Sequence, residues 1–397
     1  MIKRIRSEQL QPGMFIHDLN CGWIDHPFVF NTFRVKDEAT VQKIVAYGIR
    51  EVYIDTAAGL DVADAQTKEE VDSELHERII KVAGPAKSPP RTPLREEIVV
   101  ARQVHSEANK VVHSILSDVR LGKQIEVEQA EPVVEQITDS IFRNKDALTS
   151  LSRIKQKDNY TFQHSVSVCA LLVSFAHAMG FGRDVIREAG IGGLLHDVGK
   201  MKVPDAVLNK PASLSAQELS VMQSHAALGR EILKQTDGIP EKAILITGQH
   251  HERYDGTGYP DKLKEEAISD FGQMASIVDV YDALTSNRVY HKGMEPTAAL
   301  KKLFEWSKFH FNEELVQHFI RVIGIYPVGS LVSLESGLLA VVVQQGENNL
   351  LHPLVRAIFD PVKGFITPHD IDLANGNDRI ANHEQPTKWG VDPFRYL

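Results

Sequence analysis

The chain has 397 residues, of which 43% are hydrophobic and 24% are charged, values typical of a soluble globular protein with more than one domain. Its formal net charge of −9 counts against a nucleic-acid-binding or anionic-membrane-binding surface, because both favour basic residues. No apolar stretch follows the basic N-terminal residues, so we expect no standard secretory signal, and no run of about 18 apolar residues occurs, so we expect no membrane-spanning helix. The only two cysteines, Cys21 and Cys169, are far apart, which favours a reduced, cytoplasmic protein.

Residues 1–60 predict a small α+β domain without an evident catalytic set. Short alternating segments surround one amphipathic segment that begins at Asp37, a good N-cap, and ends at Gly48. The predicted elements are, in order, a strand at 28–35, a helix at 37–48 and a returning strand at 50–56.

Residues 61–94 are polar and then proline-rich, a composition that cannot bury a core, so we expect an extended linker. Residues 95–150 predict linking helices, and the first of them carries an apolar stripe at heptad-like spacing. A homodimer through this stripe and packing on the following domain both explain the pattern. Pro132 stands near the start of a further helix.

Residues 151–326 predict an all-helical domain, because helical patterns follow one another and each is closed by Gly or Pro. The helices are expected at 161–180, 183–197, 216–235, 241–252, 271–287, 296–308 and 312–323. Ser215 and Glu218 stand in capping-box register before the third of them. Residues 327–397 change to short alternating runs, which predict a β-rich extension packed on the helices. The predicted fold class is therefore mainly α.

The segment 193–204 begins with an apolar run that ends in adjacent His196 and Asp197. The pattern then breaks at Gly199 and Lys200. Without partners for His196, this pattern favours a plain helix end with a histidine near the negative end of its dipole. The same region, however, supplies further metal-competent side chains at helix cores and ends. The complete candidate set is His164, His196, Asp197, His225, His250, His251 and Asp279. Each alone could be a packed or polar helix residue, but a bundle brings such inward-facing residues together, so we predict a metal centre.

The chemistry of these side chains favours two divalent ions. Imidazoles bind Fe, Mn, Co, Ni or Zn, and a carboxylate can bridge two ions with its two oxygens, a role that we assign to Asp197. Two ions about 3.5 to 4 Å apart can hold a phosphodiester and lower the pKa of a bridging water. The predicted nucleophile is therefore metal-bound hydroxide, since no Gly-x-Ser-x-Gly elbow or cysteine nucleophile signature is present.

The segments GGLLHDVGKMKVP, HHERYDGTGYP and DVYDALTSNRVY occur in this order and resemble the motif set of the HD-GYP subgroup of the HD metal-dependent phosphohydrolases. The resemblance covers about 160–327 and implies hydrolysis of cyclic di-GMP to linear pGpG, with continuation to GMP left open, at a two-metal or three-metal centre. Residues 1–60, which include QLQPGMFIHDL, also resemble an N-terminal domain of unassigned function that often precedes HD-GYP domains.

By this resemblance, the seven candidate side chains match the metal ligands of the family, and Asp197 and Lys200 are the predicted catalytic residues. Lys200 is expected to contact a nonbridging phosphate oxygen, although a solvated helix-capping lysine is the alternative. Arg288 is expected to contact substrate phosphate or guanine rather than to be a surface arginine. The GYP loop consists of Gly256, Gly258, Tyr259 and Pro260. Its glycines allow positive φ and its proline fixes the exit, so we expect it to shape the site or a partner surface.

Two positions depart from the family pattern. Members with a third metal carry a glutamate about one turn before the first histidine, and this chain has Tyr160 there, a poor ligand for most divalent ions. We therefore predict two metals. Gln273 stands where many members have arginine, which weakens a substrate contact or a local ion pair but removes no metal ligand.

Three functions are compatible with these features, and the leading one is a cyclic di-GMP phosphodiesterase. The second is a sensor that binds cyclic di-GMP or a mononucleotide with little turnover and signals through the N-terminal domain and the long helices. The third is a generic HD phosphohydrolase acting on nucleoside phosphates, against which the GYP loop counts. A protein partner at the GYP loop or the N-terminal domain is a further expectation, whereas nucleic acid and membrane are not expected partners.

Overall fold

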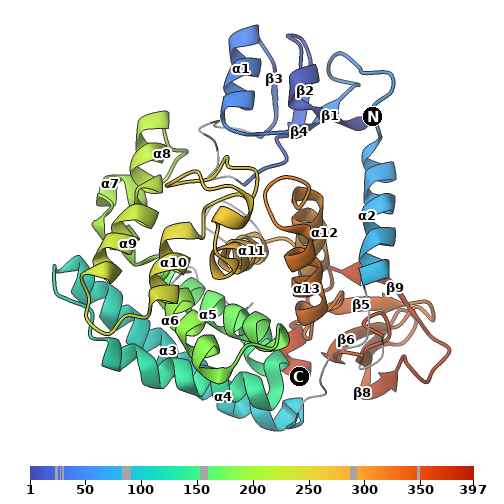
Figure 1. Ribbon diagram of the computed structural model, residues 1–397. Helices are drawn as coiled ribbons and strands as arrows, with labels where there is room; N and C mark the ends of the chain where they lie inside the picture. The colour runs from blue at the N-terminus through green and yellow to red at the C-terminus, as the bar shows by residue number, and fades with distance from the viewer. Residues whose placement is uncertain are drawn as a thin grey trace.

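The computed structural model describes residues 1–22, 26, 28, 31–82, 91–152, 160–286, 293–346 and 349–397. Figure 1 shows a helical body, a small N-terminal sheet with its helix at the top, and a C-terminal sheet at the lower right. The predicted fold class is confirmed: a mainly helical region lies between a small α+β sheet and a five-stranded antiparallel sheet. Within the described ranges, no helix combines the length and the apolar character needed to cross a membrane.

The N-terminal sheet is antiparallel, with strand order β1-β4-β2-β3, and its core contains fully buried Ile16, Ile44 and Ile54. The predicted helix and returning strand are confirmed as α1 and β4. The Asp37 side chain caps α1, because it accepts a hydrogen bond from Thr40 N at 2.8 Å. The elements are β1 (Ile2–Arg6), η1 (Ser7–Gln9), β2 (Phe15–Asp18), β3 (Phe33–Arg34), α1 (Glu38–Ala46) and β4 (Glu51–Asp55).

The expectation of an extended linker over 61–94 is wrong for its central part, which forms α2 (Lys68–Val82). Val71, Leu75 and Ile79 are buried on one face of this helix and join the core of the helical body. The average composition of the segment is polar, but the apolar residues recur every four positions, and that spacing is sufficient for a buried helix face.

The helical body has one continuous apolar core, to which α2 also contributes. Its elements are α3 (Leu94–Arg120), α4 (Val127–Leu151), α5 (Tyr160–Ala178), α6 (Arg183–Leu195), η3 (Val198–Lys202), α7 (Asp205–Leu208), α8 (Ala216–Gln223), α9 (His225–Lys234), α10 (Glu241–Gln249), η4 (Glu265–Ala267), α11 (Asp270–Thr285), α12 (Pro296–Trp306) and α13 (Glu313–Ile323). The apolar stripe of α3 is buried against α4 and α5. Packing within the chain therefore accounts for the heptad-like spacing.

The helix predicted over 216–235 is interrupted, since α8 ends at Gln223 and α9 begins at His225. The predicted capping box of Ser215 and Glu218 is confirmed at the start of α8. The carbonyl of Met222 accepts a hydrogen bond from the His225 ring at 2.7 Å. The break thus places His225 at a helix N-terminus with its ring anchored to the preceding helix.

An ion pair between buried Glu97 and partly exposed Arg143 joins α3 to α4, and we expect Glu97→Ala to lower the free energy of unfolding by about 1 to 3 kcal/mol. The Glu97 carboxylate is 2% exposed and accepts hydrogen bonds from Ser140 Oγ at 2.7 Å and from Arg143 Nε at 2.6 Å. Its removal leaves both donors without that partner. Urea unfolding measures the change, and exposed Glu96→Ala is the matched control. Equal stability of the two variants would contradict the prediction.

The C-terminal extension is an antiparallel sheet of strand order β8-β7-β6-β5-β9, which confirms the predicted β character. Its elements are β5 (Leu331–Leu334), β6 (Leu339–Gln344), β7 (Leu354–Asp360), β8 (Gly364–Asp372), β9 (Ile380–Glu384), α14 (Pro386–Trp389) and η5 (Pro393–Tyr396). Gln345 Nε2 donates to Asp146 Oδ1 at 3.1 Å and to the Ile323 carbonyl at 2.6 Å. These bonds tie the extension to α4 and α13.

Candidate metal centre

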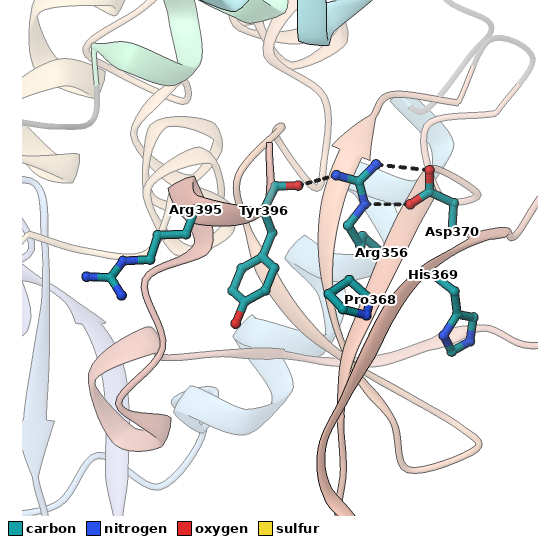
Figure 2. Close-up of a pocket in the computed structure, with 6 residues that line it drawn as sticks. All are labelled: Arg356, Pro368, His369, Asp370, Arg395 and Tyr396. Atoms are coloured by element: carbon teal, nitrogen blue, oxygen red, sulfur yellow. Dashed lines mark hydrogen bonds and ion pairs between the residues drawn. The ribbon is translucent and has the colours of Figure 1, made fainter.

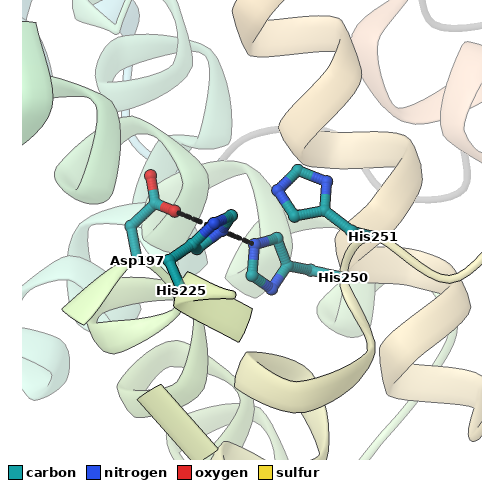
Figure 3. Close-up of side chains that lie close together, drawn as sticks. All are labelled: Asp197, His225, His250 and His251. Atoms are coloured by element: carbon teal, nitrogen blue, oxygen red, sulfur yellow. Dashed lines mark hydrogen bonds and ion pairs between the residues drawn. The ribbon is translucent and has the colours of Figure 1, made fainter. Parts of the chain in front are cut away.

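The predicted ligands converge in the helical body as two groups that share Asp197. One group contains His164 and His196, and the other, drawn in Figure 3, contains His225, His250 and His251. Within each group the potential ligand atoms lie within 4.8 Å of one another. Two buried groups with one carboxylate in common suggest a bimetallic site.

Helices far apart in sequence supply these side chains. They are His164 on α5, His196 and Asp197 directly after α6, His225 at the start of α9, His250 and His251 directly after α10, and Asp279 on α11. Asp279 closes the cluster from the side of α11, because its Oδ1 lies 2.9 Å from His164 Nε2 and its Oδ2 lies 4.0 Å from His251 Nδ1.

The two oxygens of Asp197 face different pairs of histidines. Oδ1 lies 3.3 Å from His225 Nε2 and 3.8 Å from His250 Nε2. Oδ2 lies 3.4 Å from His196 Nε2 and 3.6 Å from His164 Nε2. The side chain is 1% exposed, so water is largely excluded from it. A carboxylate between two pairs of imidazole nitrogens is the arrangement that a bridging ligand requires.

Three of the imidazoles are oriented by the backbone in the same way. The Nδ1 atoms of His196, His225 and His250 each donate a hydrogen bond to the carbonyl three residues earlier. The acceptors are Gly193, Met222 and Thr247, at 2.8, 2.7 and 2.9 Å. In a neutral ring, this bond leaves the lone pair on Nε2, which in all three cases points toward Asp197. The donor set therefore fits divalent ions of the kind that imidazole binds.

His164 is oriented by a carboxylate instead. Its Nδ1 lies 2.6 Å from Asp282 Oδ2, while its Nε2 faces the cluster. Asp282 is 2% exposed and was not among the predicted site residues. The signal was present in the sequence, because Asp279 and Asp282 are three residues apart and so share one face of α11.

We expect Asp282→Asn to weaken divalent metal binding by about 10-fold to 100-fold, the usual effect of losing a carboxylate behind a histidine ligand. The amide keeps the shape of the side chain but not the charge that orients and polarises the His164 ring. Titration of the metal-free protein with Mn(II) or Zn(II) measures the affinity. Asp270→Asn, at the exposed start of the same helix, is the control. Unchanged affinity in Asp282→Asn would contradict the assigned role.

The charges around Asp197 keep it ionised. Burial raises the pKa of the Asp197 carboxyl, but Lys200 and His196 outweigh burial and hold that pKa well below its usual range. Lys200 Nζ donates to Asp197 Oδ2 at 2.5 Å. Burial lowers the pKa of His250 to about 3 and that of His251 well below its usual value, so both rings are neutral.

His196 behaves differently from these two rings. Burial lowers its pKa, but the carboxylates of Asp197 and Asp279 outweigh burial and raise the pKa. Any proton held there must leave when the ring binds a metal ion.

The GYP loop lies against the cluster. The ring of Tyr259 stacks on His251, with centroids 4.6 Å apart and planes at 27°. Gly256 has a φ of +80°, as predicted for the loop. Gly258 has a different requirement, because a Cβ there would lie 2.3 to 2.6 Å from the backbone of 251–253. It is needed for close approach and not for positive φ. The peptide bond between Tyr259 and Pro260 is cis.

Two predicted positions lie outside the described residues, namely Arg288 and the side chain of Tyr160. Gln273 is described and is 7% exposed. Its Nε2 donates to the carbonyl of Ile268 at 2.9 Å, which fastens the turn before α11. The expectation that glutamine in place of arginine removes no metal ligand stays a prediction.

A pocket of about 400 Å³ lies on the C-terminal sheet, and none of its lining residues is a predicted metal ligand (Figure 2). Its most buried cation, Arg356, already pairs with Asp370 through Nε at 2.6 Å and NH2 at 3.0 Å. Its NH1 also donates to the Tyr396 carbonyl at 2.7 Å. These bonds engage the Arg356 guanidinium within the protein.

Comparison with known proteins identifies two families. The model of a domain of unknown function, DUF3391, matches 2–130, and the model of the HD domain matches 137–315. A cyclic di-GMP phosphodiesterase of Pseudomonas aeruginosa is 39% identical over 401 residues, which cover 100% of this chain and 95% of that protein. The 3'3'-cGAMP-specific phosphodiesterase 2 of Vibrio cholerae is 34% identical over 41% of this chain and 32% of that protein. The solved structure of an HDG"Y"P protein from Bdellovibrio bacteriovorus covers 80% of this chain and 98% of its own, with a TM-score of 0.48 and 19% identity.

Proposed function

The chain belongs to the HD domain family, and we propose that it is a metal-dependent phosphodiesterase that hydrolyses cyclic di-GMP to linear pGpG. The observation that carries the proposal is Asp197, whose two oxygens each face a different pair of imidazoles. The Pseudomonas aeruginosa relative supports the choice of substrate, because it is similar over almost its whole length and is named for this activity.

We assign the ligands of two divalent ions to the two groups that share Asp197. His164 and His196 would hold one ion, and His225, His250 and His251 would hold the other. Asp279 lies close enough to both groups to complete either. The ions, chosen from Fe, Mn, Ni, Co and Zn, would supply Lewis-acid charge and a lowered pKa for a bound water. We keep the number at two, because Tyr160 replaces the glutamate of the three-metal members.

The substrate contacts follow from charge and position. Lys200 extends from η3 toward Asp197 and its side chain is 19% exposed, so it borders both the cluster and the solvent. Its ammonium can donate to a nonbridging phosphate oxygen, which neutralises charge that develops during hydrolysis. Arg288 is the second proposed contact, to phosphate or guanine. Tyr259 with the rest of the GYP loop forms a wall of the site beside His251.

A reconstituted activity assay tests this proposal. Full-length protein loaded with Mn(II) or Fe(II) is expected to convert cyclic di-GMP to pGpG, and chromatography separates this product from GMP. The substrate panel includes 3'3'-cGAMP, because one relative is named for it, and nucleoside phosphates. Tight binding without product across several metals would favour the sensor and overturn the proposal. Turnover of nucleoside phosphates alone would favour a generic phosphohydrolase.

We further propose that the protein acts in the cytoplasm, which rests on its two cysteines at distant positions. The negative net charge supports a small anionic substrate held by metal ions over a nucleic acid held by a basic surface. A homodimer, and a protein partner at the GYP loop or the N-terminal domain, stay predictions.

A further inference from the structure

The inner side of the GYP segment, residues 253–264, is fastened to the metal centre. Glu252 directly follows the ligands His250 and His251 and is 1% exposed. Its carboxylate accepts hydrogen bonds from the backbone N–H of Asp261 at 2.7 Å and of Leu263 at 3.0 Å. Tyr259 of the same segment stacks on His251. A shift of the segment would therefore change the surroundings of the His251 ring.

The outer side of the same segment contacts the N-terminal domain. Arg50 Nε lies 3.4 Å from Asp255 Oδ2, and Asp255 Oδ1 accepts from Thr257 N at 3.0 Å and from Thr257 Oγ1 at 2.6 Å. Gly48 packs on Thr257, because a Cβ at Gly48 would lie 2.8 Å from the Thr257 Cβ. Gly48 also has a φ of +75°, so glycine serves both the turn after α1 and this close approach. In Figure 1 the N-terminal sheet stands above the segment that follows α10.

The N-terminal domain is held on α12 by a separate, buried polar network. The Tyr53 hydroxyl donates to Glu305 Oε1 at 2.6 Å. Asn20 Oδ1 accepts from Lys302 Nζ at 2.5 Å and from Trp306 Nε1 at 3.0 Å. Asn20 and Glu305 are 5% and 4% exposed, and buried partners of this kind are costly to separate. The domain is therefore anchored without the help of the GYP segment and offers it a fixed support.

We propose that the N-terminal domain seats the GYP segment against the metal centre, and that Arg50 and Gly48 are positioning residues for the reaction at His251. The inference rests on the proposed phosphodiesterase activity for its kinetic consequence. The Arg50 side chain is 40% exposed, and a pair with such an exposed arginine adds little to overall stability. Its contribution is to fix where Asp255 and the rest of the segment lie.

Arg50→Glu tests the proposal in the full-length protein. Repulsion from Asp255 should speed amide hydrogen exchange in 254–263 by roughly fivefold, the equilibrium factor of one exposed ion pair. The kcat of the Mn(II)-loaded enzyme should fall, because the displaced segment no longer holds Tyr259 in its place against His251. Arg50→Lys keeps the charge and should retain most of both. Lys36→Glu is the matched charge reversal at an exposed residue of the same domain and should alter neither. The thermal midpoint should stay the same in all three.

Unchanged exchange in 254–263 of Arg50→Glu would overturn the proposal. Faster exchange with unchanged kcat would overturn the link from the segment to His251. If the wild-type protein hydrolyses no cyclic di-GMP, the proposed function fails, and the exchange measurement alone then decides whether the domain seats the segment.

Discussion

Asp197→Ala is expected to abolish metal retention and turnover of cyclic di-GMP together, with kcat lower by at least about a thousandfold. Asp197 is the one side chain common to both ligand groups, and each of its oxygens lies within 4 Å of two imidazole nitrogens. Its removal takes a ligand from each group at once. It also removes the carboxylate that Lys200 contacts at 2.5 Å, so the positive charge of Lys200 beside the imidazoles is no longer balanced by Asp197.

The measurement pairs elemental analysis of bound metal with formation of pGpG under the same reconstitution. Asp237→Ala, at an exposed residue, controls for the loss of one negative charge and should behave as the wild type. Circular dichroism of the metal-free variant checks that the helical body has folded. A folded variant that retains both metal ions would show that Asp197 is not the shared ligand, and retained turnover would contradict the proposed reaction at this centre.

The convergence of the ligands could be predicted because helix periodicity and motif order are local properties of the sequence. Each candidate falls at a helix core or a helix end, and side chains that face the interior of a bundle come together even when they are distant in sequence. His225 is instructive, since the helix around it was predicted without its break at residue 224 and yet its ring reaches the cluster. The break coincides with a hydrogen bond from the ring to the Met222 carbonyl, which no spacing rule contains.

The residues that support the site could not be predicted as well from the sequence, because their roles depend on which helices and loops contact one another. The role of Asp282 requires that α11 lie beside α5, so that its carboxylate reaches His164. The helix α2 was overlooked because its polar residues outnumber the buried face that packs on α12 and α13. Gly258 was explained by backbone freedom, whereas the structure requires it for contact with residues 251–253. Close approach between backbones leaves no periodic trace in the sequence.

Gly199→Ala should lower the free energy of unfolding by about 3 kcal/mol or more and reduce metal binding, although it adds a single methyl group. The sequence predicts a turn glycine here, but Gly199 does not have a positive φ. It is needed because η3 and α9 approach each other closely: a Cβ would lie 1.9 Å from the His225 carbonyl oxygen and 2.5 Å from Gly229 N. A clash with backbone cannot be relieved by a side-chain rotation, so α9 must move.

Movement of α9 carries His225 away from Asp197, which is why stability and metal affinity should fall together. Urea unfolding of the metal-free protein and a Mn(II) titration measure the two effects. Gly182→Ala is the matched control, because this glycine is the N-cap of α6 with an ordinary φ of −68°, and a Cβ added there would meet no neighbouring atom within 4 Å. The control substitution should cost less than about 1 kcal/mol. If Gly199→Ala binds metal as the wild type does, α9 can withdraw without moving the His225 ring, and the close packing of η3 on α9 does not position that ligand.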